Sequence, residues 1–113
     1  MPATNQNFGM WAGNFMTLQI EVRLPDGTAP DLTGASAAWK LSDDPGGTAL
    51  ITKSASIVGP TADPPVVQVS IDAADTADLP AGQYWHEAEV TDSLGRLTTV
   101  AVGRCSLSPS LFA

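Results

Sequence analysis

Nine consecutive residues, from Met16 to Leu24, alternate between apolar and polar side chains, and this run constrains the fold more than any other feature. A period of two is that of a β-strand with one buried face, and it does not fit an amphipathic helix. The chain has three Glu and two Lys, the residues that usually cover the surface of a soluble helix, and it is rich in Gly, Pro, Thr and Ser. The sequence therefore predicts short strands and turns and excludes a helix bundle or a coiled coil.

Turn-forming residues divide the rest of the chain into further short strands. These strands are expected at residues 35–42, 50–58, 66–71, 83–91 and 97–107. The segment 50–58 alternates poorly, which favours the edge of a sheet. Between the fourth and fifth of the six strands, Asp72 to Leu79 predicts one helical turn, with Asp72 as N-cap and Asp75 in a capping box.

The last two strands are expected to form a hairpin. One register places His86, Ala88 and Val90 on the buried face, opposite Val102, Val100 and Thr98. The other face then holds six side chains: Trp85, Glu87, Glu89, Thr99, Ala101 and Cys105.

A chain of 113 residues has room for one domain. Residues 1–13 lack either periodicity and are interpreted as an extended N-terminal arm, which is also the candidate seventh strand. Residues 14–113 are expected to form the domain itself. We therefore predict an all-β fold, a single antiparallel β-sandwich of six to seven strands.

Twelve acidic residues against five scattered basic ones give a net charge of −7. Nucleic-acid binding needs clustered positive charge, so direct binding to nucleic acid is not expected, nor is attraction to an anionic membrane. No apolar run reaches the length of a membrane span, and the first residues lack the pattern of a signal peptide. Cys105 is the one cysteine, which excludes an internal disulfide and favours synthesis in a reducing cytoplasm.

Catalytic and metal-binding patterns are weak. The sharpest enzyme hypothesis is a dyad of Cys105 with His86, the one histidine, but the predicted hairpin register puts them on opposite faces and favours a structural His86. Calcium could bind Asp72, Asp75 and Asp78, or a pair such as Asp26 and Asp31, although capping and turn roles explain these acids more simply. We therefore expect no catalytic residue, no metal and no cofactor.

The aromatic residues indicate a core and an interface. Trp39 lies on an inward face, whereas Trp85 lies on the outward face of the hairpin and Trp11 lies in the arm. Exposed tryptophan is a frequent interface anchor because it buries a large area at low entropic cost. The predicted interface consists of Phe8, Met10, Trp11, Phe15 and Trp85.

The stretch from Leu79 through Gly82 to Tyr84 resembles the tyrosine corner of immunoglobulin-like sandwiches, in which a tyrosine hydroxyl bonds back to the backbone. The resemblance implies that Trp39 is the buried core tryptophan of that fold and that His86 stands in place of its second cysteine.

The order of turn motifs along almost the whole chain resembles a family of bacteriophage virion β-sandwich proteins, which includes capsid decoration proteins and the N-terminal module of siphophage upper-baseplate proteins. The motifs are Gly13-Asn14-Phe15, Asp31-Leu32-Thr33-Gly34-Ala35, Thr76 with Leu79, Gly82 and Tyr84, Asp92-Ser93-Leu94-Gly95, and Gly103. Asn14-Phe15 stands where Asp-Thr is more usual in that family.

This resemblance implies a structural protein of a phage or phage-like virion, made in the host cytoplasm. A capsid decoration or cement protein is the first expectation, and a tail, neck or baseplate protein is the alternative. The expected partners are major capsid or tail proteins and further copies of the chain in a homo-oligomer. A hypothesis of another class is a module that binds carbohydrate or another surface ligand through Tyr84 and Trp85.

Overall fold

A computed structural model describes residues 7–24, 26–44 and 47–109 of the chain. The first six residues of the predicted arm and three residues of predicted turns, Pro25, Pro45 and Gly46, lie outside these ranges, as does the C-terminal segment 110–113.

Seven strands and one short helix make up the described part of the chain. They are β1 (Phe8–Trp11), β2 (Met16–Glu21), β3 (Ser36–Ser42), β4 (Ile51–Val58), β5 (Val66–Ile71), α1 (Ala73–Thr76), β6 (Gly82–Thr91) and β7 (Leu97–Ser108). The six strands and the helical turn expected from the sequence are confirmed, most of them to within one or two residues. The seventh strand, β1, comes from the arm.

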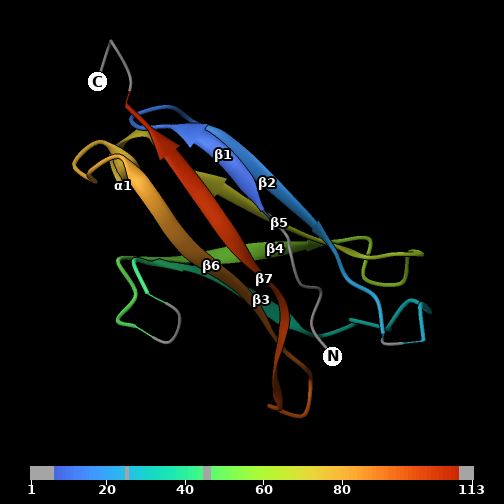
Figure 1. Cartoon of the computed structure of the whole chain (residues 1–113). Helices are drawn as coiled ribbons and strands as arrows, with labels where there is room; N and C mark the ends of the chain where they lie inside the picture. Colours follow the sequence, from blue (N-terminus) through green and yellow to red (C-terminus); the bar gives the residue numbers. More distant parts are fainter. Residues whose placement is uncertain (1–6, 25, 45–46, 110–113) are drawn as a thin grey trace.

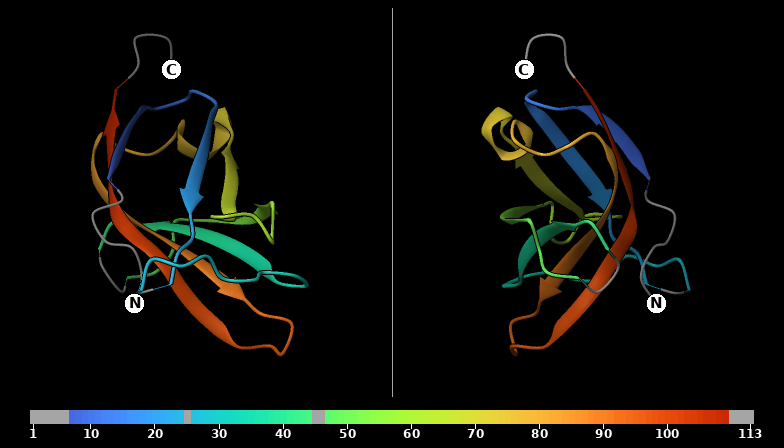
Figure 2. Two further views of the ribbon diagram at one scale, coloured as in Figure 1. Left: turned by 90° about the vertical axis from the view of Figure 1, so that its right-hand side faces the viewer. Right: turned by 60° about the vertical axis from the view of Figure 1, so that its left-hand side comes forward.

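The strands follow the order β1-β7-β6-β3-β4-β5-β2 and fold into two facing layers (Figures 1 and 2). Strand β4 joins the layers, because its residues 51–55 pair with β3 whereas residues 56–58 pair with β5. The predicted all-β, immunoglobulin-like sandwich is confirmed. The predicted purely antiparallel pairing is wrong at one point, since β1 runs parallel to β7.

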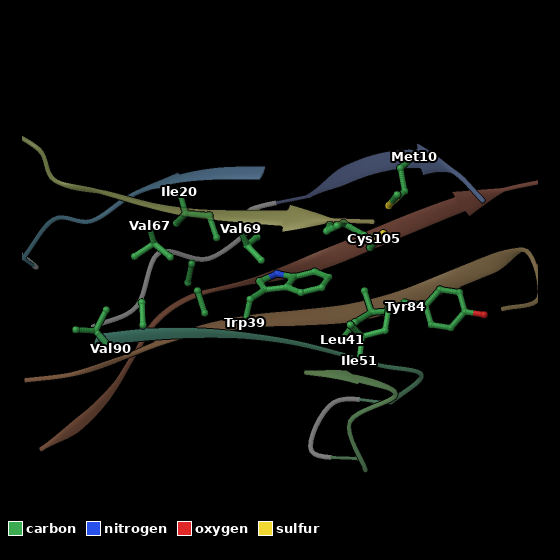
Figure 3. Packing of buried hydrophobic residues seen from close by; sticks show 14 of the residues in the cluster. Met10, Ile20, Trp39, Leu41, Ile51, Val67, Val69, Tyr84, Val90 and Cys105 are labelled. Atoms are coloured by element: carbon green, nitrogen blue, oxygen red, sulfur yellow. The ribbon is translucent and has the colours of Figure 1, made fainter. Parts of the chain in front are cut away.

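The core lies between the two layers and is centred on Trp39, which is 1% exposed (Figure 3). Val67 and Val69 of β5 cover it from one layer, and Leu41 and Ala88 belong to the other. Burying the inward side chains of alternating strands is the main source of stability in such a sandwich. The prediction that Trp39 belongs to the core is confirmed.

A β-bulge in the last hairpin corrects the predicted register. Val90 faces Thr98 as expected, but beyond a shift at Ala88 and Glu89 the partner of Ala88 is Ala101. One extra residue in β7 shifts the following residues to the other face, which alternation alone does not reveal. Ala101 is therefore fully buried, and its predicted outward position is wrong.

The same shift also corrects the predicted position of Cys105. It pairs with Tyr84 and is 1% exposed, on the core side and not on the predicted outer face. Trp85, Glu87 and Glu89 lie on the opposite face from the core, as predicted, and each is half-buried.

The interpretation of residues 1–13 as an arm outside the core is wrong for Met10 and Ala12, which are 8% and 7% exposed. Phe8 and Met10 point inward from β1, whereas Trp11 points outward. A strand of four residues is too short to display a period of two, so its burial depends on pairing with β7, which no local pattern encodes.

Candidate interaction site

The turn between β1 and β2 presents the two most exposed described aromatic side chains. Trp11 is 57% exposed at the end of β1, and Phe15 is 64% exposed just before β2. The chain reverses between them through Gly13, whose φ of 78° suits glycine, and the Asn14 amide donates to the Trp11 carbonyl at 3.3 Å. The turn lies at one end of the sandwich, next to the end of β7 (Figure 1).

A hydrogen bond fixes this turn to the helix α1. The amide of Gly13 donates to Oγ1 of Thr76 at 2.9 Å, and Thr76 is 2% exposed. A turn held by a buried partner keeps the backbone that carries its side chains in place, so less conformational entropy is lost when the turn binds a partner. The β1–β2 turn is therefore a preorganised apolar contact, which we call the aromatic turn, with Trp11 and Phe15 as its anchors.

The helix α1 is itself anchored by an ion-pair cluster. Lys53 Nζ lies 3.1 Å from a carboxylate oxygen of Asp72 and 2.9 Å from one of Asp75. The carboxylate of Asp75 also accepts from the Asp72 amide at 2.7 Å, so the predicted capping role of these residues is confirmed. The hydrogen bonds to Asp75 and Asp72 raise the pKa of Lys53.

Burial works to raise the pKa of Asp75, but the Lys53 ammonium and the Asp72 amide together outweigh it and lower that pKa. The ammonium group thus sits where a cation would have to bind Asp72 and Asp75. Two of the other acids proposed for calcium serve their own turns, since Asp26 accepts from Thr28 and Asp31 accepts from Thr33.

Trp85, a predicted interface anchor, is half-buried, and a neighbouring cationic side chain lies over its ring. The Arg104 guanidinium lies 4.8 Å from the centre of its ring. A cleft of about 170 Å³ separates the indole from the loop that follows β3, and Lys40 and Glu89 form an ion pair of 3.5 Å at its rim. Because Arg104 already covers Trp85, this side chain offers a weaker contact than Trp11 or Phe15.

Tyr84 is 6% exposed, and its hydroxyl donates to the carbonyl of Pro80. The predicted corner is therefore confirmed, with Gly82 at the start of β6 and Leu79 packed against the core. Burial, followed by the nearby Asp43 and Cys105, raises the Tyr84 pKa. Since Tyr84 points into the corner, it cannot share an exposed cleft with Trp85, and the carbohydrate hypothesis loses one of its two aromatic groups.

His86 lies in the core at 1% exposure, where its Nδ1 accepts a hydrogen bond of 3.1 Å from Trp39 Nε1. Phe8 packs edge-on against the imidazole with the ring centroids 5.0 Å apart. Three strands thus meet at this ring. Cys105 shares the core, and burial raises the pKa of its thiol to about 11. A protonated, buried thiol is a poor nucleophile, so the pair lacks the access that a catalytic dyad needs.

A second cleft, of about 330 Å³, opens at the opposite end of the sandwich, beside the β6–β7 hairpin. Its walls are mixed, with the apolar side chains of Val22, Leu32 and Val90 beside charged and hydroxyl groups. The two arginines at this cleft are engaged, Arg23 with Asp63 and Arg96 with Asp92, at 3.1 and 2.7 Å. The cleft therefore presents no unpaired arginine to orient an anionic ligand.

Within the described residues, no three His, Cys, Asp or Glu side chains gather closely enough to hold a metal ion. No helix of that same part of the chain has the length and apolar character needed to cross a membrane.

Two contacts at these surfaces were not predicted. Thr76 lies in a helical turn that was predicted. Its hydrogen bond with Gly13 was not predicted, because no local sequence pattern links these two distant residues. The contact of Arg104 with Trp85 follows from their direct pairing across the hairpin, and the correct bulge position would have revealed it.

No protein-family model matches this chain, and no curated protein matches it. Among solved structures, CopC from Methylosinus trichosporium OB3b is similar with a TM-score of 0.46 and 15% identity, over 96% of this chain and 86% of that one. AggA, the major subunit of aggregative adherence fimbriae type I from Escherichia coli, is similar with a TM-score of 0.37 and 15% identity, over 94% and 90%. Likeness at this level carries no function to this chain.

Proposed function

We propose that this protein is a structural component of a phage or phage-like virion, and within it a capsid decoration or cement protein. In this proposal the chain acts by binding and not by catalysis. It docks on a neighbouring virion protein through the aromatic turn. The single observation that carries the proposal is the exposure of Trp11 and Phe15 on a turn that Thr76 holds in place.

Trp11 and Phe15 are largely exposed to water in the single chain. Each leaves more than half of its accessible surface in water, and covering that surface with a partner is favourable. The turn needs little ordering on binding, because its hydrogen bond to α1 already exists in the single chain. Because the turn motifs resemble those of virion sandwich proteins, the partner that we expect is another virion protein.

The remaining surface fits a protein present at high local concentration. The net charge of −7 favours solubility and resists nonspecific association between copies. An acidic module with a small apolar contact binds through that contact and not through its surface at large.

Quantitative mass spectrometry of purified particles tests the proposal. Particles released by cells that encode this chain are separated into heads and tails, and the chain is measured relative to the major capsid protein. A decoration protein co-purifies with heads in many copies. Its presence in the tail fraction would move it to the alternative location, as a tail, neck or baseplate protein, and its absence from all particles would refute the virion role.

The docking surface is tested in the same assay with the double variant Trp11→Ser/Phe15→Ser. The matched control is Leu94→Ser, which changes an even more exposed apolar residue, 75% exposed, on the β6–β7 hairpin. The double variant is expected to fold but to be lost from particles, whereas the control is retained. Retention of the double variant at the level of the unmodified chain would overturn the assigned surface.

A further inference from the structure

Strand β2 forms an open edge of the sandwich. It lies at one end of the strand order, and among the described residues β5 is its one pairing partner. Figure 2 shows β2, in light blue, at the border of its layer. A strand at an edge leaves a row of backbone donors and acceptors without strand partners, which is a template for another strand.

The register identifies which backbone groups point outward. The Val22 amide donates to the Pro65 carbonyl at 3.0 Å, so Val22 directs its backbone toward β5. Backbone groups alternate in direction along an antiparallel pair. Residues 16, 18 and 20 therefore bond to β5, and Thr17, Gln19 and Glu21 direct their N–H and C=O groups away from it.

Strand β2 lacks the features with which proteins usually block an open edge. Its six residues contain no lysine and no proline. They pair antiparallel with the residues of β5 from Ile71 to Val66, and this pairing has no bulge. In a chain with a net charge of −7, the strand carries one charged side chain, Glu21. The edge is thus regular and almost neutral.

We propose that two copies of this chain pair along β2, antiparallel, about a two-fold axis that passes through Gln19. Thr17 of each copy then faces Glu21 of the other, and Gln19 faces Gln19. All three outward residues of each strand are paired, which allows up to six backbone hydrogen bonds. This inference rests on the proposed function, which it deepens by naming a second copy as the partner on this edge.

The side chains are compatible with this axis on both faces. On the core side, Leu18 lies opposite Ile20 of the second copy, and Met16 lies opposite its Val22. The half-buried side chains of Met16 and Leu18 thereby become less exposed to solvent. On the outer side, the Gln19 amide already donates to Gln68 at 3.2 Å, so pairing would build a row of four glutamines.

The charges of the strand are compatible with a second copy as the occupant. No like charges stand directly opposite, because each Glu21 faces a threonine, and the axis itself passes through a neutral residue. Since opposite pairs on adjacent strands interact most strongly, a repulsive pair at the axis would oppose this arrangement, and this strand has none.

Sedimentation velocity of the purified chain over a wide range of concentrations tests the pairing, with Gln19→Lys and Gln19→Glu as variants. The unmodified chain is expected to form a dimer. Each variant places two like charges face to face on the axis, and its dimer is expected to be weaker by at least about fivefold. An equimolar mixture of the two variants is expected to form a dimer again, because lysine then faces glutamate. Gln83→Lys, an exposed glutamine on β6, is the matched control and should leave the dimer unchanged.

Hydrogen exchange locates the interface within the strand. The amides of Thr17, Gln19 and Glu21 should become protected as the concentration rises, while those of Leu18 and Ile20, bonded to β5, provide the internal reference. A monomer at all concentrations, or a dimer unaffected by Gln19→Lys, would overturn the pairing. These readouts come from pure protein, so they fail or succeed separately from the virion role, which is read from the content of particles.

Discussion

Replacing His86 by leucine tests whether the buried hydrogen bond at the centre of the core holds the sandwich together. Trp39 Nε1 donates to His86 Nδ1 at 3.1 Å, and each residue is 1% exposed. Leucine fills the site with an apolar side chain but removes the acceptor, Nδ1 of His86. In the described part of the chain no buried side-chain nitrogen or oxygen lacks a partner, so His86→Leu would create the first such group.

The expected cost follows from that orphaned indole N–H. Leaving a buried donor without a partner costs about 1–3 kcal/mol, and leucine also loses the edge contact of the imidazole with Phe8. We expect the free energy of unfolding to fall by about 2 kcal/mol or more in urea titrations followed by far-UV circular dichroism. Circular dichroism is preferred to fluorescence because one of the partner variants removes a tryptophan.

A double-mutant cycle with Trp39→Phe separates the hydrogen bond from packing. Trp39→Phe alone leaves His86 Nδ1 without its donor, whereas the double variant removes both polar partners. The double variant should therefore lose less stability than the two single losses added together, by about 1 kcal/mol or more. Losses that add to within about 0.5 kcal/mol would show that the two groups are not coupled and would refute this reasoning.

Tyr84→Phe removes the hydroxyl that donates to the Pro80 carbonyl and is expected to cost about 1 kcal/mol in the same urea assay; an unchanged midpoint would remove the corner bond as a source of stability. Lys53→Met removes the ammonium group that holds Asp72 and Asp75, and the stability that it loses should depend on pH. The folded-state pKa of Asp75 is lowered from 3.8, so its contribution is present above that pH and is lost as the pH falls through the folded value. The pKa of Lys53 is raised from 10.5, so its contribution is present below that pH and is lost as the pH rises through the folded value. The difference in thermal midpoint between Lys53→Met and the unmodified chain should thus be largest between these limits and shrink beyond them, and a difference independent of pH would contradict the ion-pair assignment.

Features encoded by neighbouring residues were predictable from the sequence. Alternation located β2 and β5, Asp72 identified the start of α1, and the spacing from Leu79 to Tyr84 identified the corner. Each of these depends on side chains within a few residues of one another. The sequence therefore specified the fold class and the residue that closes the corner.

Features that depend on pairing between distant segments were not predictable. The bulge near Ala88 reverses the face of every following residue of β7, and it turned Cys105 from a predicted surface residue into a core residue. No single-strand pattern distinguishes the two registers, because Val100, Ala101 and Val102 are all small and apolar. The hydrogen bond from Gly13 to Thr76 likewise joins residues 63 positions apart.

The aromatic turn can hold its side chains in a defined position because the strand that leads into it is attached to the core. The predicted arm, which was separate from the core, lacked this attachment. Within β1, Met10 is buried while the adjacent Trp11 is exposed, so the same four residues attach the strand and present the anchor. A truncation of residues 2–13 removes Met10 and Ala12 from the core together with Trp11 from the surface, and it cannot separate docking from folding. Substitution of Trp11 and Phe15 can, because their side chains are exposed and the Gly13 bond to Thr76 involves only the backbone of the turn. Loss of binding in that variant with an unchanged thermal midpoint would therefore report on the contact surface alone.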